Sequence, residues 1–452
     1  SNGRHVDGHA NHTPRGRYTL SRDLLIRNAR LMDPARGVDD RMDLLIREGL
    51  ISAVGQFDTD DVTPSIDAEH LLLCPGFVDL CAHFREPGEE HKASIRSEGI
   101  AAAAGGITTV FHTPDTLPVA DTPAVVQLIT ERAQKEAQVR LIPIGALTRG
   151  LNGEDLSEME SLKRAGCRAV SNAHKPIRDA LVLRRALEYA ASHDLLVVVR
   201  PEDCALVDMG CVHEGFVSTA MGLRGIPDAA ETVAVAQVLA LIELTGAKVH
   251  FGRLSSAKAV RSIARAQEKG MPVTADVAIH QLHLTEEAVK TFDPNAHVRP
   301  PFRTLSDRDA LRKGIRDGVI TAVCSDHRPH EPNAKLDAFP STEPGVASLE
   351  TLLPLLLQLV EAEEISLMRA IALITSGPSK IMGLEAGSLE VGARADFCLV
   401  DPEMTWEVTK DNWHSAGFNT PFWGQTFRGR VVRTFQAGRE VFSLFREGRG
   451  QV

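Results

Sequence analysis

The 452-residue sequence lacks any apolar run near the ~20 residues that a membrane-spanning helix needs, and its start lacks the charged-then-apolar layout of a signal peptide. Positive charge is not in excess, because the net charge is −10, which disfavours broad contact with nucleic acid or an anionic membrane. Neither a GxGxxG motif nor a P-loop follows the first β-like segments, so nucleotide binding has no support. We therefore expect small molecules or other proteins as partners, with no nucleic acid and no membrane.

Paired-cysteine motifs are also missing. The seven cysteines are an odd number, are spread along the chain, and include several inside apolar runs such as LLLCPGF. Cys204 and Cys211 have no CxxC partner, which argues against a separate zinc site. This usage predicts reduced thiols and a cytoplasmic protein.

The two ends of the chain differ in composition from its middle. Residues 1–20 are polar and predict a flexible tail, in which His5, His9 and His12 are expected to be solvated. Residues 21–75 and 385–447 both hold short apolar runs broken by Gly, Pro and Asp, which is typical of small strands joined by turns. We expect these two segments to pair into one composite β domain.

Residues 76–384 show short β-like runs that alternate with longer helical patterns. The predicted strands are 76–80, 107–111, 139–146, 168–171, 195–199, 248–252, 272–277 and 319–324. The clearest helices are 122–137, 179–192, 228–245 and 256–269. Eight such units predict an α/β fold of the (β/α)₈ TIM-barrel type, with functional groups at the carboxyl ends of the strands. A doubly wound open sheet is the alternative, because periodicity alone does not show closure.

Six ordered segments carry a resemblance to a known family. They are PGFVDLCAHFREPG at 75–88, PDTLPV at 114–119, VRPPFR at 298–303, SDHRPH at 325–330, EPGVASLE at 343–350 and NTPFWG at 419–424. Together they resemble the dihydroorotases, zinc amidohydrolases of pyrimidine synthesis, in which the first four read PGxxDxHxHxREPG, PNTxPV, VNPPLR and TDHAPH. The resemblance covers residues 23–446.

The resemblance implies metal ligands at the ends of several barrel strands, and most of these positions have changed. Cys81 stands where the family has the first histidine of the HxH pair, whereas His83 keeps the second. The bridging carboxylate or carbamylated lysine falls at Asn172 or Ala173, and neither side chain supplies such a ligand. Only His83 and, after the eighth strand, Asp326 keep the family's ligand identity.

Arginines stand at two further ligand positions that the resemblance implies. Arg200 replaces the fifth-strand histidine, and Arg253 replaces the second histidine of the sixth-strand HxxH pattern. A guanidinium has no acceptor lone pair, and at about 4 Å with an effective dielectric near 20 it repels a dication by roughly 8 kcal/mol. The sequence therefore predicts vestigial metal positions, a vestigial rather than catalytic Asp326, no zinc and no other cofactor.

The substrate-pocket positions implied by the resemblance are mixed. Arg85, which in the family grips the substrate carboxylate, is present, and so is His330. The two family asparagines align with Asp115 and Arg299, which change the charge of the pocket. We expect dihydroorotate to lose its usual amide partners here.

The charged groups near the predicted barrel mouth leave two interpretations open. Four arginines, at positions 85, 200, 253 and 299, either pair with Asp115, Glu202 and Asp326 in place of a metal, or bind an anionic ligand. We expect Arg200 or Arg253 to form an ion pair with Asp326. Four other histidines are expected to be core, loop, surface or packing residues, namely His250, His327, His280 and His283.

The favoured hypothesis is an inactive, dihydroorotase-like (pseudo-dihydroorotase) subunit. By resemblance it would help to assemble aspartate transcarbamoylase in pyrimidine biosynthesis, as a homo- and hetero-oligomer. One alternative is an active amidohydrolase or dihydroorotase acting on a cyclic amide, with one zinc held by His83, Asp326 and either Cys81 or His174. Another is an anion-binding module that uses the arginine cluster, with phosphate or carbamoyl aspartate as test ligands.

Overall fold

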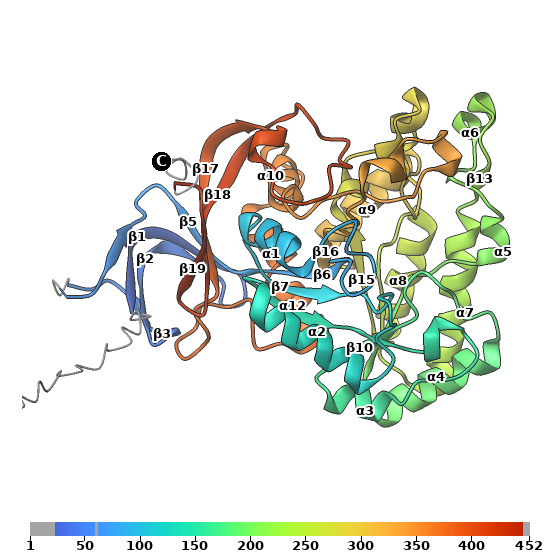
Figure 1. The fold of residues 1–452 in the computed structure, drawn as a ribbon, viewed down its shortest axis with the longest axis horizontal. Helices are drawn as coiled ribbons and strands as arrows, with labels where there is room; N and C mark the ends of the chain where they lie inside the picture. Colours follow the sequence, from blue (N-terminus) through green and yellow to red (C-terminus); the bar gives the residue numbers. More distant parts are fainter. Residues whose placement is uncertain (1–22, 59–61, 446–452) are drawn as a thin grey trace, which may run out of the picture.

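The computed structural model describes residues 23–58 and 62–445, and the expected tail at 1–20 lies outside them. At one end of the molecule, strands from the N-terminal and C-terminal segments of the chain form one sheet. Its strand order is β19-β18-β17-β5-β1-β2-β3, with β4 paired to β1 (Figure 1). The strands are β1 (Leu24–Asp33), β2 (Val38–Arg47), β3 (Leu50–Gly55), β4 (Ser65–Asp67), β5 (Leu72–Pro75), β17 (Phe397–Glu407), β18 (Thr426–Gln436) and β19 (Arg439–Ser443). Leu73 of β5 faces Leu399 of β17, and this antiparallel pairing joins the two ends of the chain.

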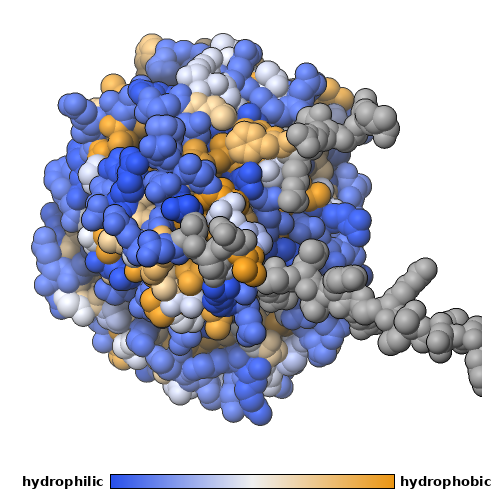
Figure 2. Space-filling view, turned by 90° about the vertical axis from the view of Figure 1, so that its left-hand side faces the viewer, coloured by the Kyte–Doolittle hydropathy of each residue, from blue (hydrophilic) through white to orange (hydrophobic). Residues whose placement is uncertain are grey.

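Apolar side chains fill the interior of this sheet. Leu31, Leu44 and Phe397 are fully buried in one cluster, and the ring of Phe397 stacks on Phe435 with centroids 4.5 Å apart. Figure 2 views the molecule from this end, where hydrophilic residues cover most of the face and leave small apolar patches between them. The predicted sheet from both chain ends is confirmed, whereas the domain boundaries at 21–75 and 385–447 stay a prediction.

A (β/α)₈ barrel occupies the other end of the molecule (Figure 1). Its strands are β6 (Phe77–Ala82), β7 (Ile107–His112), β8 (Arg140–Pro143), β9 (Gly145–Ala146), β10 (Ala169–Ser171), β11 (Leu196–Val199), β14 (Val249–Phe251), β15 (Val273–Ala278) and β16 (Ala322–Cys324). β8 pairs in parallel with β7, and β9 pairs in parallel with β10. The predicted strand 139–146 is therefore divided into β8 and β9, which together fill one strand position of the barrel. A parallel bridge joins Ala82, the last residue of β6, to His327, which follows β16.

Helices cover the outside of the barrel. They are α1 (Ile95–Ala104), α2 (Pro123–Glu136), α3 (Met159–Arg164), α4 (Ala180–Ser192), α5 (Cys204–Val207), α6 (Phe216–Met221), α7 (Ala229–Thr245), α8 (Ala257–Glu268), α9 (Leu305–Asp317), α10 (Leu352–Glu361), α11 (Leu367–Ala372) and α12 (Ser376–Met382). The four helices predicted from periodicity correspond to α2, α4, α7 and α8. Capping residues explain two of the starts, because Asp179 accepts from the Leu181 backbone N–H and Ser256 from that of Ala259.

Shorter elements complete the fold. They are β12 (Val212–His213), β13 (Gly225–Ile226) and the 3₁₀ segments η1 (Arg149–Leu151), η2 (Ile279–Leu282), η3 (Glu286–Thr291), η4 (Pro294–Ala296), η5 (Pro332–Lys335), η6 (Phe339–Ser341) and η7 (Lys410–Asn412). The predicted strand 319–324 was too long, because Ile320 still bonds to Gly314 in the turn after α9. Over the ranges that the structure describes, no helix is long and apolar enough to cross a bilayer.

Candidate functional site

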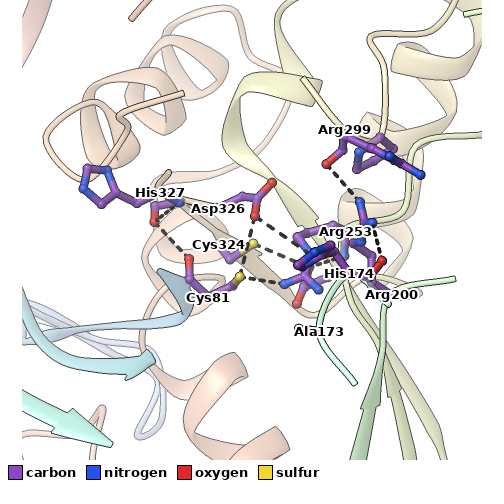
Figure 3. A network of polar contacts seen from close by, with 12 residues as sticks. Cys81, Ala173, His174, Arg200, Arg253, Arg299, Cys324, Asp326 and His327 are labelled. Atoms are coloured by element: carbon purple, nitrogen blue, oxygen red, sulfur yellow. Dashed lines mark hydrogen bonds and ion pairs between the residues drawn. The ribbon is translucent and has the colours of Figure 1, made fainter. Parts of the chain in front are cut away.

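The site residues gather where the barrel strands end. Cys81 is the next-to-last residue of β6, and Arg200, Arg253 and Asp326 lie one or two residues after the ends of β11, β14 and β16, respectively (Figure 3). Two of these residues lie in the left-handed backbone region, with φ of 59° at Arg253 and 47° at Asp326. Non-glycine residues rarely adopt this region, and where they do the surrounding structure must hold them there. The chain turns sharply at both positions.

Arg253 occupies the space between two former ligand positions. Its Nη1 donates to the Cys81 sulfur at 2.6 Å, and its Nε lies 4.0 Å from Oδ1 of Asp326 (Figure 3). The Cys81 thiol in turn donates to Oδ1 of Asp326, with 3.6 Å between sulfur and oxygen. Burial raises the pKa of the Cys81 thiol well above its usual range, although the Arg253 charge acts to lower it. In these surroundings the protonated thiol is the favoured form of Cys81 at neutral pH.

Arg200 pairs with a carboxylate other than Asp326. Its Nη2 lies 3.3 Å from Oε1 of Glu202, and its Nη1 donates to the Arg299 carbonyl at 3.2 Å. Arg299 holds the same Glu202 carboxylate with two hydrogen bonds, of 3.0 Å from Nε and 2.6 Å from Nη2. Fork geometry of this kind is among the stronger charge-assisted interactions in proteins. The expected ion pair with Asp326 is thus made by Arg253, while Arg200 and Arg299 share Glu202.

Asp115 contacts two histidines. Its Oδ2 lies 3.2 Å from Nε2 of His83 and 3.3 Å from Nδ1 of His174. Burial acts to raise the pKa of Asp115, but His83 and His174 outweigh it and hold that pKa well below its usual range. The other ring nitrogen of His83 lies 3.2 Å from the His327 carbonyl oxygen. Both nitrogens of His83, the retained family histidine, are therefore engaged by protein groups.

Asn172 and Ala173, at the position of the family's bridging ligand, belong to a loop. The Asn172 amide oxygen accepts from Thr148 Oγ1 at 2.6 Å, and its amide nitrogen donates to the Lys175 carbonyl at 2.7 Å. Ala173, with φ of 52°, faces the barrel mouth and brings only a methyl group. Neither of the two candidate residues offers a carboxylate or carbamate there.

Arg85 and His330, at the two retained substrate positions, also make internal contacts. Arg85 donates from Nε to the Pro329 carbonyl at 3.0 Å and from Nη1 to Glu89 at 2.9 Å. The His330 ring lies against the Lys92 ammonium and the Pro344 carbonyl, each at 3.0 Å. Burial and the neighbouring cations lower the pKa of His330. Both side chains are buried and positioned by the loops around them.

The remaining histidines serve packing and hydrogen bonding. His250 is buried and contacts Asp276 at 2.7 Å, which agrees with its expected core role. His327, expected in a loop, is also fully buried, where its Nε2 lies 2.8 Å from Glu98. His280 and His283 are largely enclosed as well, and His280 packs edge-on against Phe302.

A small cavity lies at the centre of these residues. It has a volume of about 20 Å³ and is lined by His83, Thr113, Ala173, His174, Arg200, Arg253, Arg299, Asp326 and Arg328. Arg328 was missed by the sequence reasoning, although a signal existed: the family segment TDHAPH has alanine where SDHRPH has Arg328. A larger pocket of about 470 Å³ lies beside it, between the ends of β10 and β11 and helices α4 and α7.

Comparison with known proteins first gives the class. The family model "Amidohydrolase family" matches residues 213–441, and the model "Dihydro-orotase-like" matches residues 70–259. Among solved structures, an L-hydantoinase (dihydropyrimidinase) from Arthrobacter aurescens superposes with a TM-score of 0.84 over 93% of this chain and 96% of that one, at 22% identity. A dihydropyrimidinase from Brevibacillus agri gives 0.82 over 93% and 95%, at 23% identity. The fold is the amidohydrolase TIM barrel.

Sequence relatives then give the family. A dihydroorotase-like protein of Pseudomonas putida is 45% identical over 91% of this chain and 97% of its own length. A dihydroorotase of Geobacter sp. is 42% identical over 93% and 99%. The chain therefore belongs to the dihydroorotase family. Members of the wider superfamily normally use metal ions, so the donor set of this site can be tested against that requirement.

The residues present do not fit a zinc site. Zinc needs several thiolate, imidazole or carboxylate donors converging on one point. In the described part of the chain, no three His, Cys, Asp or Glu side chains are grouped in that way. At the former centre, Cys81 contacts Arg253 and Asp326, both ring nitrogens of His83 are engaged by protein groups, and a guanidinium lies beside Asp326.

Proposed function

We propose that this chain is a non-catalytic, dihydroorotase-like subunit that supports the assembly of aspartate transcarbamoylase in the cytoplasm. The observation that carries the proposal is the position of Arg253, whose guanidinium lies between Cys81 and Asp326 where the family places metal ligands. The strands and helices of the barrel, and the strands of the sheet at the other end of the molecule, are all formed. The fold is intact while the metal-ligand positions have changed, so we expect the chain to act through its surface, by binding a partner. The family resemblance supplies the identity of that partner.

Two features support the inactive and cytoplasmic parts of this proposal. Arg85 and His330 are held by Glu89, Pro329 and Pro344. All seven cysteines are free, and most are buried, as in proteins of reducing compartments. We propose no step of chemistry for this centre, because no residue in it is arranged to activate water.

Co-assembly and turnover test the proposal directly. The chain and an aspartate transcarbamoylase chain are expressed together and separately, and the mass of each product is measured by light scattering after gel filtration. We expect a joint complex at micromolar concentration, in which the transcarbamoylase is active and dihydroorotase turnover is absent. A transcarbamoylase that assembles and turns over equally well alone, with no joint complex, would contradict the structural role.

The second candidate is an active amidohydrolase that acts on a cyclic amide. The name of the Geobacter relative, dihydroorotase, favours it, as do the retained His83 and Asp326. It requires one metal held by these two residues with Cys81 or His174, and turnover that is lost when His83 is replaced. Zinc content measured beside dihydroorotase turnover distinguishes the two functions.

A further inference from the structure

The small cavity at the barrel mouth is surrounded by hydrogen-bond donors without partners. Nε of Arg200, Nε of Arg253, Nε of Arg328 and Oγ1 of Thr113 are all buried, and none has a hydrogen-bond partner among the described residues. All four residues line the cavity of about 20 Å³. The side chains of Arg200 and Arg253 are 6% and 8% exposed, so bulk water does not satisfy them. Buried donors in proteins normally have a partner, so these four indicate a missing acceptor.

Guanidinium groups outnumber carboxylates among the residues that line the cavity. Glu202 serves both Arg200 and Arg299, and Arg253 faces Asp326. Arg328 has no ion-pair partner within residues 23–58 and 62–445. Four of the residues that line the cavity carry a guanidinium group, whereas one of them, Asp326, carries a carboxylate.

The electrostatics of Arg200 agree with this count. Burial lowers the pKa of Arg200 to about 10, and the charges of Arg253, Arg299 and Arg328 act in the same direction against Glu202. A guanidinium whose cationic form is disfavoured in this way gains from a negative charge beside it. Its surroundings therefore favour an anion.

We propose that this cavity binds one small monovalent inorganic anion, of the size class of chloride. The anion would accept from the arginine Nε groups and from Thr113, and its charge would offset part of the excess of guanidinium groups at the cavity wall. A cavity of about 20 Å³ has room for one group of about the size of a water molecule or a halide ion. A site that holds a dication in the family would thus hold an anion in this chain. The inference shares with the proposed function only the loss of the metal, and it does not depend on the partner.

Anion-dependent thermal stability tests the inference. The thermal midpoint of the full chain is measured in sodium chloride, sodium bromide and sodium gluconate at equal ionic strength. We expect a midpoint that rises and saturates with chloride or bromide, because a ligand that binds only the folded state stabilises it, while the bulky gluconate gives no such rise. Equal midpoints in the three salts would overturn the proposal.

Arg328→Ala is the informative variant, because it introduces the residue of the family segment and breaks no ion pair that the structure describes. We expect it to abolish the chloride-dependent rise and to raise the midpoint in gluconate, where the guanidinium groups at the cavity wall repel one another. A merely structural arginine would lower the midpoint in both salts. Arg328→Gln, which removes the charge and keeps more of the side chain, provides a second variant. The matched control is Arg164→Ala on α3, whose side chain is 72% exposed, and it should keep the full chloride effect.

A crystal grown in bromide gives the location. We expect an anomalous signal in the cavity, within hydrogen-bond distance of the Arg253 and Arg328 side chains. Water alone at that position, or a chloride effect that persists in Arg328→Ala, would overturn the proposal. A joint complex with transcarbamoylase that shows no anion effect would remove this inference and leave the proposed function standing. Stoichiometric zinc in the same cavity would remove the inference and the non-catalytic part of the function together.

Discussion

The Nε atom of Arg253 lies 4.0 Å from Oδ1 of Asp326, and the two side chains are 8% and 9% exposed. These residues come from the ends of β14 and β16 and occupy two positions that the family uses for metal ligands. The charge that Asp326 would meet in a metal is here supplied by a side chain of the same protein. We therefore expect that removing either charge destabilises the folded protein.

Asp326→Ala should destabilise the protein by about 3 kcal/mol, because removing one partner of a buried pair leaves the other charge uncompensated. The free energy of unfolding in urea measures the loss. Asp194→Ala is the control, since the Asp194 side chain is 74% exposed in its pair with Lys248 and exposed ion pairs contribute little to stability. A change no larger than that of the control would show that Arg253 does not need Asp326.

Wild-type protein should hold well under one zinc per chain after dialysis. Cys81→His, Arg200→His and Arg253→His, combined in one chain, restore three imidazoles beside His83 and Asp326 and should raise the bound zinc several-fold. Metal analysis by mass spectrometry gives both values. Near-stoichiometric zinc in the wild type, lost when His83 or Asp326 is replaced, would contradict the prediction.

The protein should lose stability as the pH falls from about 6.5 towards 4. Burial lowers the pKa of His280 to about 4, so its ring stays neutral in the folded state, while the unfolded chain takes up a proton below its ordinary pKa of about 6.5. The stability contributed by the neutral ring is complete above pH 6.5 and falls by about 2 kcal/mol between pH 7 and pH 5.

His280→Phe tests this pH dependence, because a phenyl ring can pack against Phe302 without titrating. Urea unfolding at pH 7 and pH 5 should show about 2 kcal/mol less loss in the variant than in the wild type. His70→Phe, at an exposed position, should keep the wild-type difference. An identical pH dependence in all three proteins would remove His280 as a cause.

Glu202→Gln should cost about 3 kcal/mol, since one carboxylate serves both Arg200 and Arg299 and its loss leaves two guanidinium groups facing each other. Thermal and urea unfolding both measure the effect. Glu188→Gln, which breaks a pair with Arg184 whose side chains are 45% and 46% exposed, serves as the comparison and should change little. Equal effects in the two variants would contradict a buried network at the mouth.

The fold was largely accessible from the sequence, because strand and helix periods and the ordered family segments are local signals. Helices such as α4 begin at a capping residue, which the sequence displays. The split of 139–146 into β8 and β9 was not accessible, since it depends on which neighbour each half pairs with. Long-range pairing of this kind leaves no trace in local periodicity.

The positions of the site residues were also predicted, whereas several of their partners were not. One of the two interpretations paired Asp115 with an arginine, whereas in the structure Asp115 contacts His83 and His174. The choice depends on side-chain directions at several strand ends, which only the folded barrel sets. Arg328 was different, because its departure from the family segment was visible in the sequence.

The sheet built from both chain ends also constrains how the protein is made. Leu72–Pro75 of β5 pair with residues 397–400 of β17, more than 300 positions later in the chain. At roughly 5–20 residues per second, a ribosome needs on the order of 15–60 seconds to synthesise that interval. During this time β5 has no β17 to pair with, and an unpaired strand edge is a template for association with other chains. The nascent protein is therefore most exposed to aggregation before β17 emerges, after the barrel sequence is already complete.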